Sequence, residues 1–273
     1  MNDTDDRPPD PQRWRRAAEI LVEQRRTLAP IDALPEALAP RTEAEGYAVQ
    51  GAARPLLERA GLGPPVGHKI GCTTAVMQAF LGIPNPASGR IHAAAVLRGH
   101  ARVPRRRFVR VGIECEIAVE LGRDLLAADA PYDRANVAHA VRAVMPAIEI
   151  VDDRYRDFRT AGVPLLIADD FFHSGCVLGE PVTHWRDIDL AALAGAIVID
   201  GKEVGRGTGA SVMGHPLAAL AWLANARLIG DAEPLRAGEF VMLGSLVETQ
   251  WLEAGMRTRI EIERLGTVAL DVA

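Results

Sequence analysis

The sequence predicts an α+β fold with a mixed, largely antiparallel β-sheet and an N-terminal helical region. Short apolar runs bounded by Gly, Pro or Asp, which are typical of strands, recur after Pro65. These runs outnumber the amphipathic segments between them, and Asp200-Gly201 has the composition of a two-residue hairpin turn. A regular βαβ repeat would alternate strands with helices, so we expect a sheet that is not uniformly parallel.

The N-terminal part of the chain has helical patterns. Residues 11–29 place apolar side chains at helical spacing, and a proline-broken stretch follows. Thr42-Glu43-Ala44-Glu45 has the form of a capping box, which predicts a second helix to about Arg59, ended by Gly61 and Gly63. We therefore divide the chain into a disordered tail over 1–12, a helical region over 13–65 and a larger domain over 66–273.

Two further helices and six strands are predicted in the larger domain. The helices cover Asp133–Met145 and Pro216–Ala226, the second with Pro216 in its first turn. The strands are expected at 69–73, 109–121, 147–151, 176–178, 196–200 and 240–243.

Composition excludes several classes of protein. The formal net charge of −5 argues against a nucleic-acid partner, because neutralising phosphates needs a basic face. We find no apolar run of 18 residues and no apolar segment near the N-terminus, so neither a membrane span nor a signal peptide is expected. Cys72, Cys115 and Cys176 are odd in number and far apart, which favours reduced, buried thiols in a cytoplasmic protein.

Three glutamates lie inside apolar, strand-like runs. Glu114 and Glu116 are two residues apart, so in a strand they point to the same side. Buried together they repel unless a cation or a shared proton compensates, and a divalent metal is the simplest solution. Glu149 lies in a second apolar strand, and three carboxylates suit Mg²⁺ or Mn²⁺. The alternatives are a wet edge strand for the pair and a salt bridge to an arginine for Glu149.

A lysine opens another apolar run. Lys69 is followed by Ile70, Gly71 and Cys72 and then by two threonines. Such a lysine can bind a substrate carboxylate, or can act as an acid or base if its pKa is lowered. A plain surface lysine is the alternative, because lysines are almost never fully buried unless they are paired.

Taken in order, these segments resemble the 2-keto-4-pentenoate hydratase and 4-oxalocrotonate decarboxylase family, part of the fumarylacetoacetate hydrolase superfamily. The resemblance spans nearly the whole chain. The matching segments are 69–73, 81–86, 114–118 with 121–124, 146–152, 168–169 with 177–179, 209–216, 221–225, and 237–239 with 244–246.

This resemblance implies a β-sheet roll of the fumarylacetoacetate hydrolase C-terminal type, with 66–273 as the metal-binding catalytic domain. It implies that Mg²⁺ or Mn²⁺ is held by Glu114, Glu116 and Glu149. The catalytic candidates are Lys69 and Ser245, and the substrate-binding candidates are Thr73, Phe172 and His173. We also expect a homo-oligomer whose partner is a small 2-oxo or 2-hydroxydienoic acid.

The reaction that the resemblance implies is hydration of a 2-hydroxy-2,4-dienoate of the 2-oxo-4-pentenoate type to a 4-hydroxy-2-oxo acid. The metal would chelate the 2-oxo acid and stabilise an enolate, and Lys69 would carry a proton. A decarboxylase of a 4-oxalocrotonate-type substrate is the first alternative, because the same enolate receives the electrons left by CO₂. An acylpyruvate C–C hydrolase and a non-catalytic homologue that binds a 2-oxo acid are the others.

Two departures from the family pattern bear on this choice. Hydratases of the family usually carry an acidic residue where this chain has Ala87, and the decarboxylase branch lacks that acid. The small Ser-Ser pair of the family is replaced by Phe172-His173. A bulkier, partly aromatic wall is therefore expected around the substrate.

Overall fold

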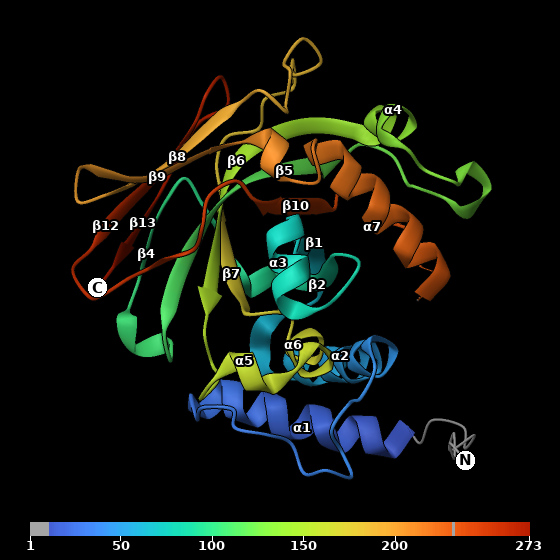
Figure 1. Cartoon of the computed structure of the whole chain (residues 1–273). Helices are drawn as coiled ribbons and strands as arrows, with labels where there is room; N and C mark the ends of the chain where they lie inside the picture. The colour runs from blue at the N-terminus through green and yellow to red at the C-terminus, as the bar shows by residue number, and fades with distance from the viewer. Residues whose placement is uncertain (1–10, 231–232) are drawn as a thin grey trace.

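A strongly curved sheet forms the centre of the molecule in the computed structural model, which describes residues 11–230 and 233–273 (Figure 1). β5 (Val111–Leu121) and β6 (Val141–Asp152) are its longest strands and lie beside each other in antiparallel register. β11 (Gln250–Trp251) also pairs with β5. The strand order is β2 (Ala87–His92), β1 (Pro65–Gly71), β10 (Phe240–Ser245), β5 (Val111–Leu121), β6 (Val141–Asp152), β7 (His173–Leu178) and β3 (Val96–Arg98).

The two edges of this sheet approach each other. β2 and β3 are joined by the short 3₁₀ turn Ala93–Ala95, and β2 also contacts β7. A Cβ atom added at Gly175 of β7 would lie 2.9 Å from the carbonyl oxygen of Ala95. Glycine is thus required where the edges meet. The sheet becomes a roll whose inner face carries buried apolar side chains, among them Ile91, Ala118, Met145, Ala147, Cys176 and Met242.

A second sheet packs against the outer face of the roll. Its strand order is β4 (His100–Val103), β13 (Gly266–Val272), β12 (Arg257–Ile262), β8 (Ala194–Ile199) and β9 (Lys202–Thr208). Ile113 and Ile117 of β5 share one hydrophobic core with Ile197 and Ile260, and α7 (Pro216–Gly230) adds to it. Only β1–β10, β3–β7 and β4–β13 are parallel pairs among the described strands, which confirms the predicted mixed, largely antiparallel α+β fold.

Helices from two parts of the chain form a layer at one end of the roll (Figure 1). They bury a second core that contains Leu21, Val49 and Ile167. The layer consists of α1 (Pro11–Thr27), α2 (Glu43–Leu57), α5 (Phe158–Ala161) and α6 (Val163–Ala168), while α3 (Ala75–Leu81) follows β1. Among the described residues, no helix is long and apolar enough to span a bilayer.

Both predicted N-terminal helices are present. Thr42 caps α2 as expected, accepting a hydrogen bond from the backbone N–H of Glu45. The carboxylate of Glu45 accepts from the N–H of Arg41 instead of that of Thr42, so the capping box is displaced by one residue. Residues 1–10 of the predicted tail lie outside the described residues, and Pro11 and Gln12 already belong to α1.

The helix predicted over Asp133–Met145 is wrong. α4 covers only Arg134–Val137, a 3₁₀ turn reaches Ala140, and β6 begins at Val141. Apart from the exposed Arg142, every residue of β6 is buried, so the polar alternation of a half-exposed strand is missing. A short run buried on both faces cannot be distinguished from a helix by apolar spacing alone.

The hairpin predicted at Asp200-Gly201 is confirmed. It joins β8 to β9, with φ of 48° at Asp200 and 81° at Gly201. Positive φ at both central residues is the geometry of a type I′ turn, whose twist matches antiparallel strands. The helix predicted from Pro216 is also present as α7.

Candidate metal and substrate site

Three glutamates meet on the inner face of the roll. Glu114 of β5 lies directly opposite Glu149 of β6, and Glu116 faces the same side of the sheet two residues further along β5. One carboxylate oxygen from each residue lies within 4.8 Å of the other two. Glu116 and Glu149 are 0% and 1% exposed, so the alternative of a wet edge strand does not apply.

Each carboxylate is oriented by a donor from a different segment. The backbone N–H of Gly244 donates to Oε2 of Glu116 at 2.9 Å, and Oγ1 of Thr249 donates to Oε1 of Glu114 at 2.5 Å. Gly244 has a φ of 115°, and a Cβ atom there would lie 2.4 Å from Oγ1 of Thr73. A side chain at this position would therefore displace the amide that holds Glu116.

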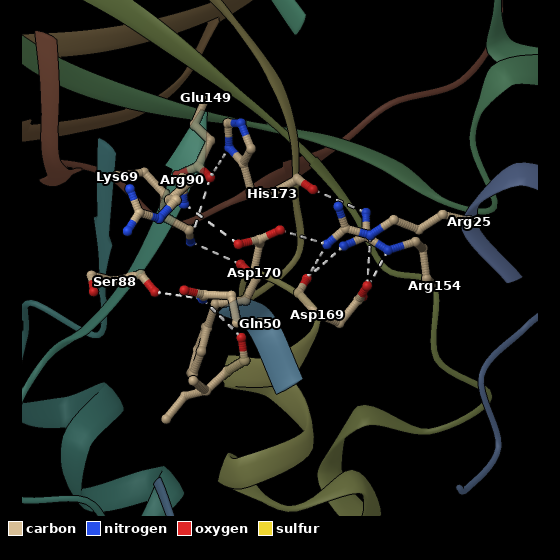
Figure 2. Close-up of polar contacts among 12 residues, drawn as sticks. Arg25, Gln50, Lys69, Ser88, Arg90, Glu149, Arg154, Asp169, Asp170 and His173 are labelled. Atoms are coloured by element: carbon tan, nitrogen blue, oxygen red, sulfur yellow. Dashed lines mark hydrogen bonds and ion pairs between the residues drawn. The ribbon is translucent and has the colours of Figure 1, made fainter. Parts of the chain in front are cut away.

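Two bases converge on the third carboxylate (Figure 2). Nδ1 of His173 lies 2.8 Å from Oε1 of Glu149, and Nζ of Lys69 lies 3.4 Å from the same oxygen. Lys69 also donates to the carbonyl oxygen of Phe171 at 2.8 Å and is only 2% exposed. The surface alternative for this lysine is thereby excluded, and its burial is compensated by the acids beside it.

The pKa values in the cluster are shifted by burial and by the close approach of three acids to one lysine. Burial and the neighbouring Glu149 raise the pKa of Glu114 to about 7, and the same two causes together with Glu114 raise that of Glu116. Burial would also raise the pKa of Glu149, but Lys69 and His173 outweigh it and lower this pKa. Burial would lower the pKa of Lys69, but the three glutamates outweigh it, so the ammonium form is favoured.

The donor set fits a hard divalent cation. Oε1 of Glu116 is buried and has no hydrogen-bond partner within the described part of the chain. A buried carboxylate oxygen without a donor is costly, and it faces two further acids. Oxygen ligands from three carboxylates are those that Mg²⁺ and Mn²⁺ prefer. The cluster can therefore hold a metal ion.

The structure places the other predicted site residues at different distances from this centre. Ser245 lies opposite Glu116 in register, and its hydroxyl donates to the carbonyl oxygen of Val247 at 2.5 Å. Thr73 packs against Gly244, beside the amide that binds Glu116. Phe172 belongs to a group of aromatic rings and contacts Phe171. Lys69 and His173 are thus the two residues of this set that reach the carboxylates directly.

A buried ion-pair network fixes the turn before His173 (Figure 2). Asp169 accepts hydrogen bonds from Nε of Arg25 at 2.7 Å and from Nε of Arg154 at 2.8 Å. Arg25 also donates to Asp170 at 3.0 Å, which ties α1 to this turn. Burial would raise the pKa of Asp169, but the two guanidinium groups outweigh it and lower this pKa.

The same turn contains an unusual backbone. Asp170, Phe171 and Phe172 have φ values of 54°, 51° and 67°, and none of them is glycine. A run of left-handed residues is unfavourable and persists only where the surrounding structure fixes it. The arginines therefore position the carbonyl oxygen that binds Lys69 and the ring that binds Glu149.

Arg25→Gln is expected to lower the free energy of unfolding by about 2 kcal/mol, because it leaves buried acids with fewer partners. Arg26→Gln provides a matched control, since Arg26 is exposed and pairs with the exposed Glu23, so a clearly smaller loss is expected. Urea denaturation of both variants measures the difference. Equal losses in the two variants would contradict the role assigned to Arg25.

Several residues of this site were not predicted from the sequence. Arg25, Thr249 and Phe171 lie 144, 135 and 102 residues from the partners that they contact. Their hydrogen bonds depend on the strand register and on the docking of α1. The one local signal was the pair of acids at Asp169 and Asp170 in an apolar segment, since buried acids require cationic partners.

Residues 76–273 match the family described as fumarylacetoacetate (FAA) hydrolase C-terminal, and the chain belongs to this family. The 2-keto-4-pentenoate hydratase of Paraburkholderia phymatum is 36% identical over 246 residues, which cover 89% of this chain and 90% of that protein. A 4-oxalocrotonate decarboxylase of a Pseudomonas species is 33% identical over 207 residues, which cover 76% and 78%. These relatives are lyases, so the resemblance seen in the sequence is confirmed.

A solved structure is similar over nearly the whole chain. The 4-oxalocrotonate decarboxylase from Pseudomonas putida G7, complexed with calcium and acetate, matches with a TM-score of 0.88 and 25% sequence identity. The match covers 98% of this chain and 100% of that one. The helical layer and the roll are therefore both shared with that decarboxylase.

Proposed function

We propose that this protein is a metal-dependent lyase that hydrates a 2-hydroxy-2,4-dienoate to a 4-hydroxy-2-oxo acid. The observation that carries the proposal is a buried lysine ammonium 3.4 Å from one of three clustered carboxylates. The three carboxylates can bind a cation, and the lysine ammonium can donate a proton to a small acid bound beside that cation. The hydratase relative at 36% identity supports this choice of reaction.

Glu114, Glu116 and Glu149 would hold Mg²⁺ or Mn²⁺. The ion would supply a Lewis acid for the carboxylate and 2-oxo oxygens of the substrate. A cation in a solved structure of a related decarboxylase, in that case calcium, is consistent with this assignment. Oε1 of Glu116, which has no donor among residues 11–230 and 233–273, is the oxygen most clearly available to such an ion.

Lys69 would move the proton. In the first step a proton is added at C5 of the dienoate and the 2-hydroxyl loses its proton. The product of this step is a conjugated 2-oxo-3-enoate. Nζ of Lys69 is in the ammonium form that can donate, and the carbonyl oxygen of Phe171 fixes its direction. The hydroxyl of water then adds at C4 and a proton at C3. Ser245 is proposed as a second catalytic residue near the reacting atoms.

His173 would act by holding Glu149, because Nδ1 is committed to that carboxylate. Thr73 and Phe172 are proposed to line the substrate. The roll over 66–273 would form the metal-binding catalytic domain, while the helical region over 13–65 would support it through Arg25. We also propose that the protein acts as a homo-oligomer.

Purified protein with Mg²⁺ or Mn²⁺ is expected to remove the ultraviolet band of 2-hydroxypenta-2,4-dienoate at about 1 s⁻¹ or faster, within the usual range for enzymes. A chelator should abolish this turnover, and added metal should restore it. An unchanged band with both metals would contradict the proposed hydration.

Decarboxylation of a 4-oxalocrotonate-type acid is the second candidate, and Ala87 favours it. This alanine stands where hydratases of the family usually carry an acid. It is 0% exposed and lies in an apolar cluster with Cys72 and Phe171. A relative at 33% identity is named for this reaction. Release of CO₂ from 4-oxalocrotonate, with no loss of the dienoate band, would favour decarboxylation over hydration.

A further inference from the structure

A row of phenylalanine rings leads away from the carboxylate cluster. It begins at Lys69, whose Nζ lies 5.5 Å from the ring centroid of Phe171. The centroid distances are 6.0 Å from Phe171 to Phe172, 5.5 Å from Phe172 to Phe158 and 6.4 Å from Phe158 to Phe80. Exposure rises along this row, from 5% at Phe171 to 57% at Phe80.

The direction of the row limits where a ligand can extend. The inner face of the roll is filled by buried side chains such as Met145 and Met242. Exposure increases along the row, so a molecule held at the carboxylates can extend in that direction. On that side α3 adds Val76 and Met77, which are also exposed and apolar.

The charged residues beside these rings are paired with other charged residues. Residues 74–82, which include Phe80, contain no Asp, Glu, Lys or Arg. Asp157 and Arg159, on either side of Phe158, pair with each other. Asp169 and Asp170, directly before Phe171, pair with Arg25, and Asp169 also pairs with Arg154. A carboxylate at the far end of a substrate would lose hydration here without gaining a cation that is not already paired, since Arg159 pairs with Asp157 and Arg156 with Asp32. An alkyl or aryl group would instead bury apolar area.

We propose that the row from Phe171 to Phe80 is the binding surface for an apolar substituent at the far end of the substrate. The substrate class is then a 2-hydroxydienoic or 2-oxo acid with an alkyl or aryl tail, not a dicarboxylate. This inference rests on the proposed function for the position of the acid end. It makes Phe158 and Phe80 specificity-determining residues of that site.

Binding of saturated 2-oxo acids to the Mg²⁺-loaded protein, measured by calorimetry, tests the inference without requiring turnover. The dissociation constant of 2-oxooctanoate is expected to be lower than that of 2-oxopentanoate by about tenfold or more, because three further carbons are buried. 2-Oxosuberate has the same chain length but ends in a carboxylate, and should bind about tenfold more weakly than 2-oxooctanoate.

Phe158→Ala and Phe80→Ala should each reduce the preference for 2-oxooctanoate over 2-oxopentanoate by about threefold or more. Val204→Ala is the matched control, since Val204 is an exposed apolar residue of the second sheet. This variant should keep the wild-type preference for 2-oxooctanoate over 2-oxopentanoate. Binding of 2-oxosuberate as tightly as 2-oxooctanoate, or an unchanged preference in both phenylalanine variants, would overturn the inference.

Turnover assays separate this inference from the proposed function. Turnover of 2-hydroxypenta-2,4-dienoate without any preference for 2-hydroxyocta-2,4-dienoate would overturn the apolar surface alone. Tight binding of 2-oxooctanoate with no turnover of either dienoate would overturn hydration and support the apolar surface.

Discussion

Lys69→Met is expected to lower kcat/KM for the dienoate by about a thousandfold, within the range measured for the loss of a general acid. Methionine keeps most of the length of the side chain but carries no proton to donate. The ammonium lies 3.4 Å from Glu149 and is held by the carbonyl oxygen of Phe171. In the presence of Mn²⁺ the variant should remain folded, because the cation compensates the carboxylates. The change is measured by steady-state kinetics at saturating Mn²⁺.

The sequence offers a matched control for this experiment, because Lys202 is its only other lysine. Lys202 is exposed on β9, in the second sheet, so Lys202→Met should leave kcat/KM unchanged. Thermal unfolding of Lys69→Met with Mn²⁺ separates lost chemistry from lost structure. A folded Lys69→Met variant that retains more than about a tenth of the activity would remove Lys69 from the mechanism.

Much of the carboxylate cluster could be predicted because its signal is local. A strand periodicity of two is enough to place Glu114 and Glu116 on one side of the sheet. The apolar neighbours of Glu149 predict that it is buried and needs a partner. Neither rule gives the register in which Glu114 lies opposite Glu149, and this pairing makes three acids a cluster.

The parts that could not be predicted depend on contacts between distant segments. The Asp133–Met145 helix failed because the burial of β6 on both faces is a property of its neighbours and not of its own sequence. The partners of Asp169 come from α1 and from the segment after β6. Local spacing indicates that these acids need cations but does not indicate which of the 31 basic residues provide them.

Glu116→Gln is expected to weaken the binding of Mg²⁺ or Mn²⁺ by about a hundredfold or more, while stabilising the metal-free protein at pH 8. Burial and two neighbouring acids raise the pKa of Glu116 in the folded protein. The folded state therefore holds a proton that the unfolded chain releases above about pH 4.5. The associated stability is present below that pH and is lost as pH rises through the folded-state pKa. Glutamine does not ionise, so the variant keeps this stability.

At pH 8 with chelator, the variant should therefore exceed the wild type in free energy of unfolding by at least about 1.4 kcal/mol, which corresponds to one unit of pKa. Near pH 4.5 the two proteins should be equally stable. Added Mn²⁺ reverses the order at pH 8, because the ion stabilises only the protein that binds it. Glu120→Gln is the control on the same strand, since Glu120 pairs with Arg142 outside the cluster. If Glu116→Gln is less stable than the wild type in chelator at pH 8, the Glu116 carboxylate is stabilised by a structural partner within the protein and its role as a cation ligand is contradicted.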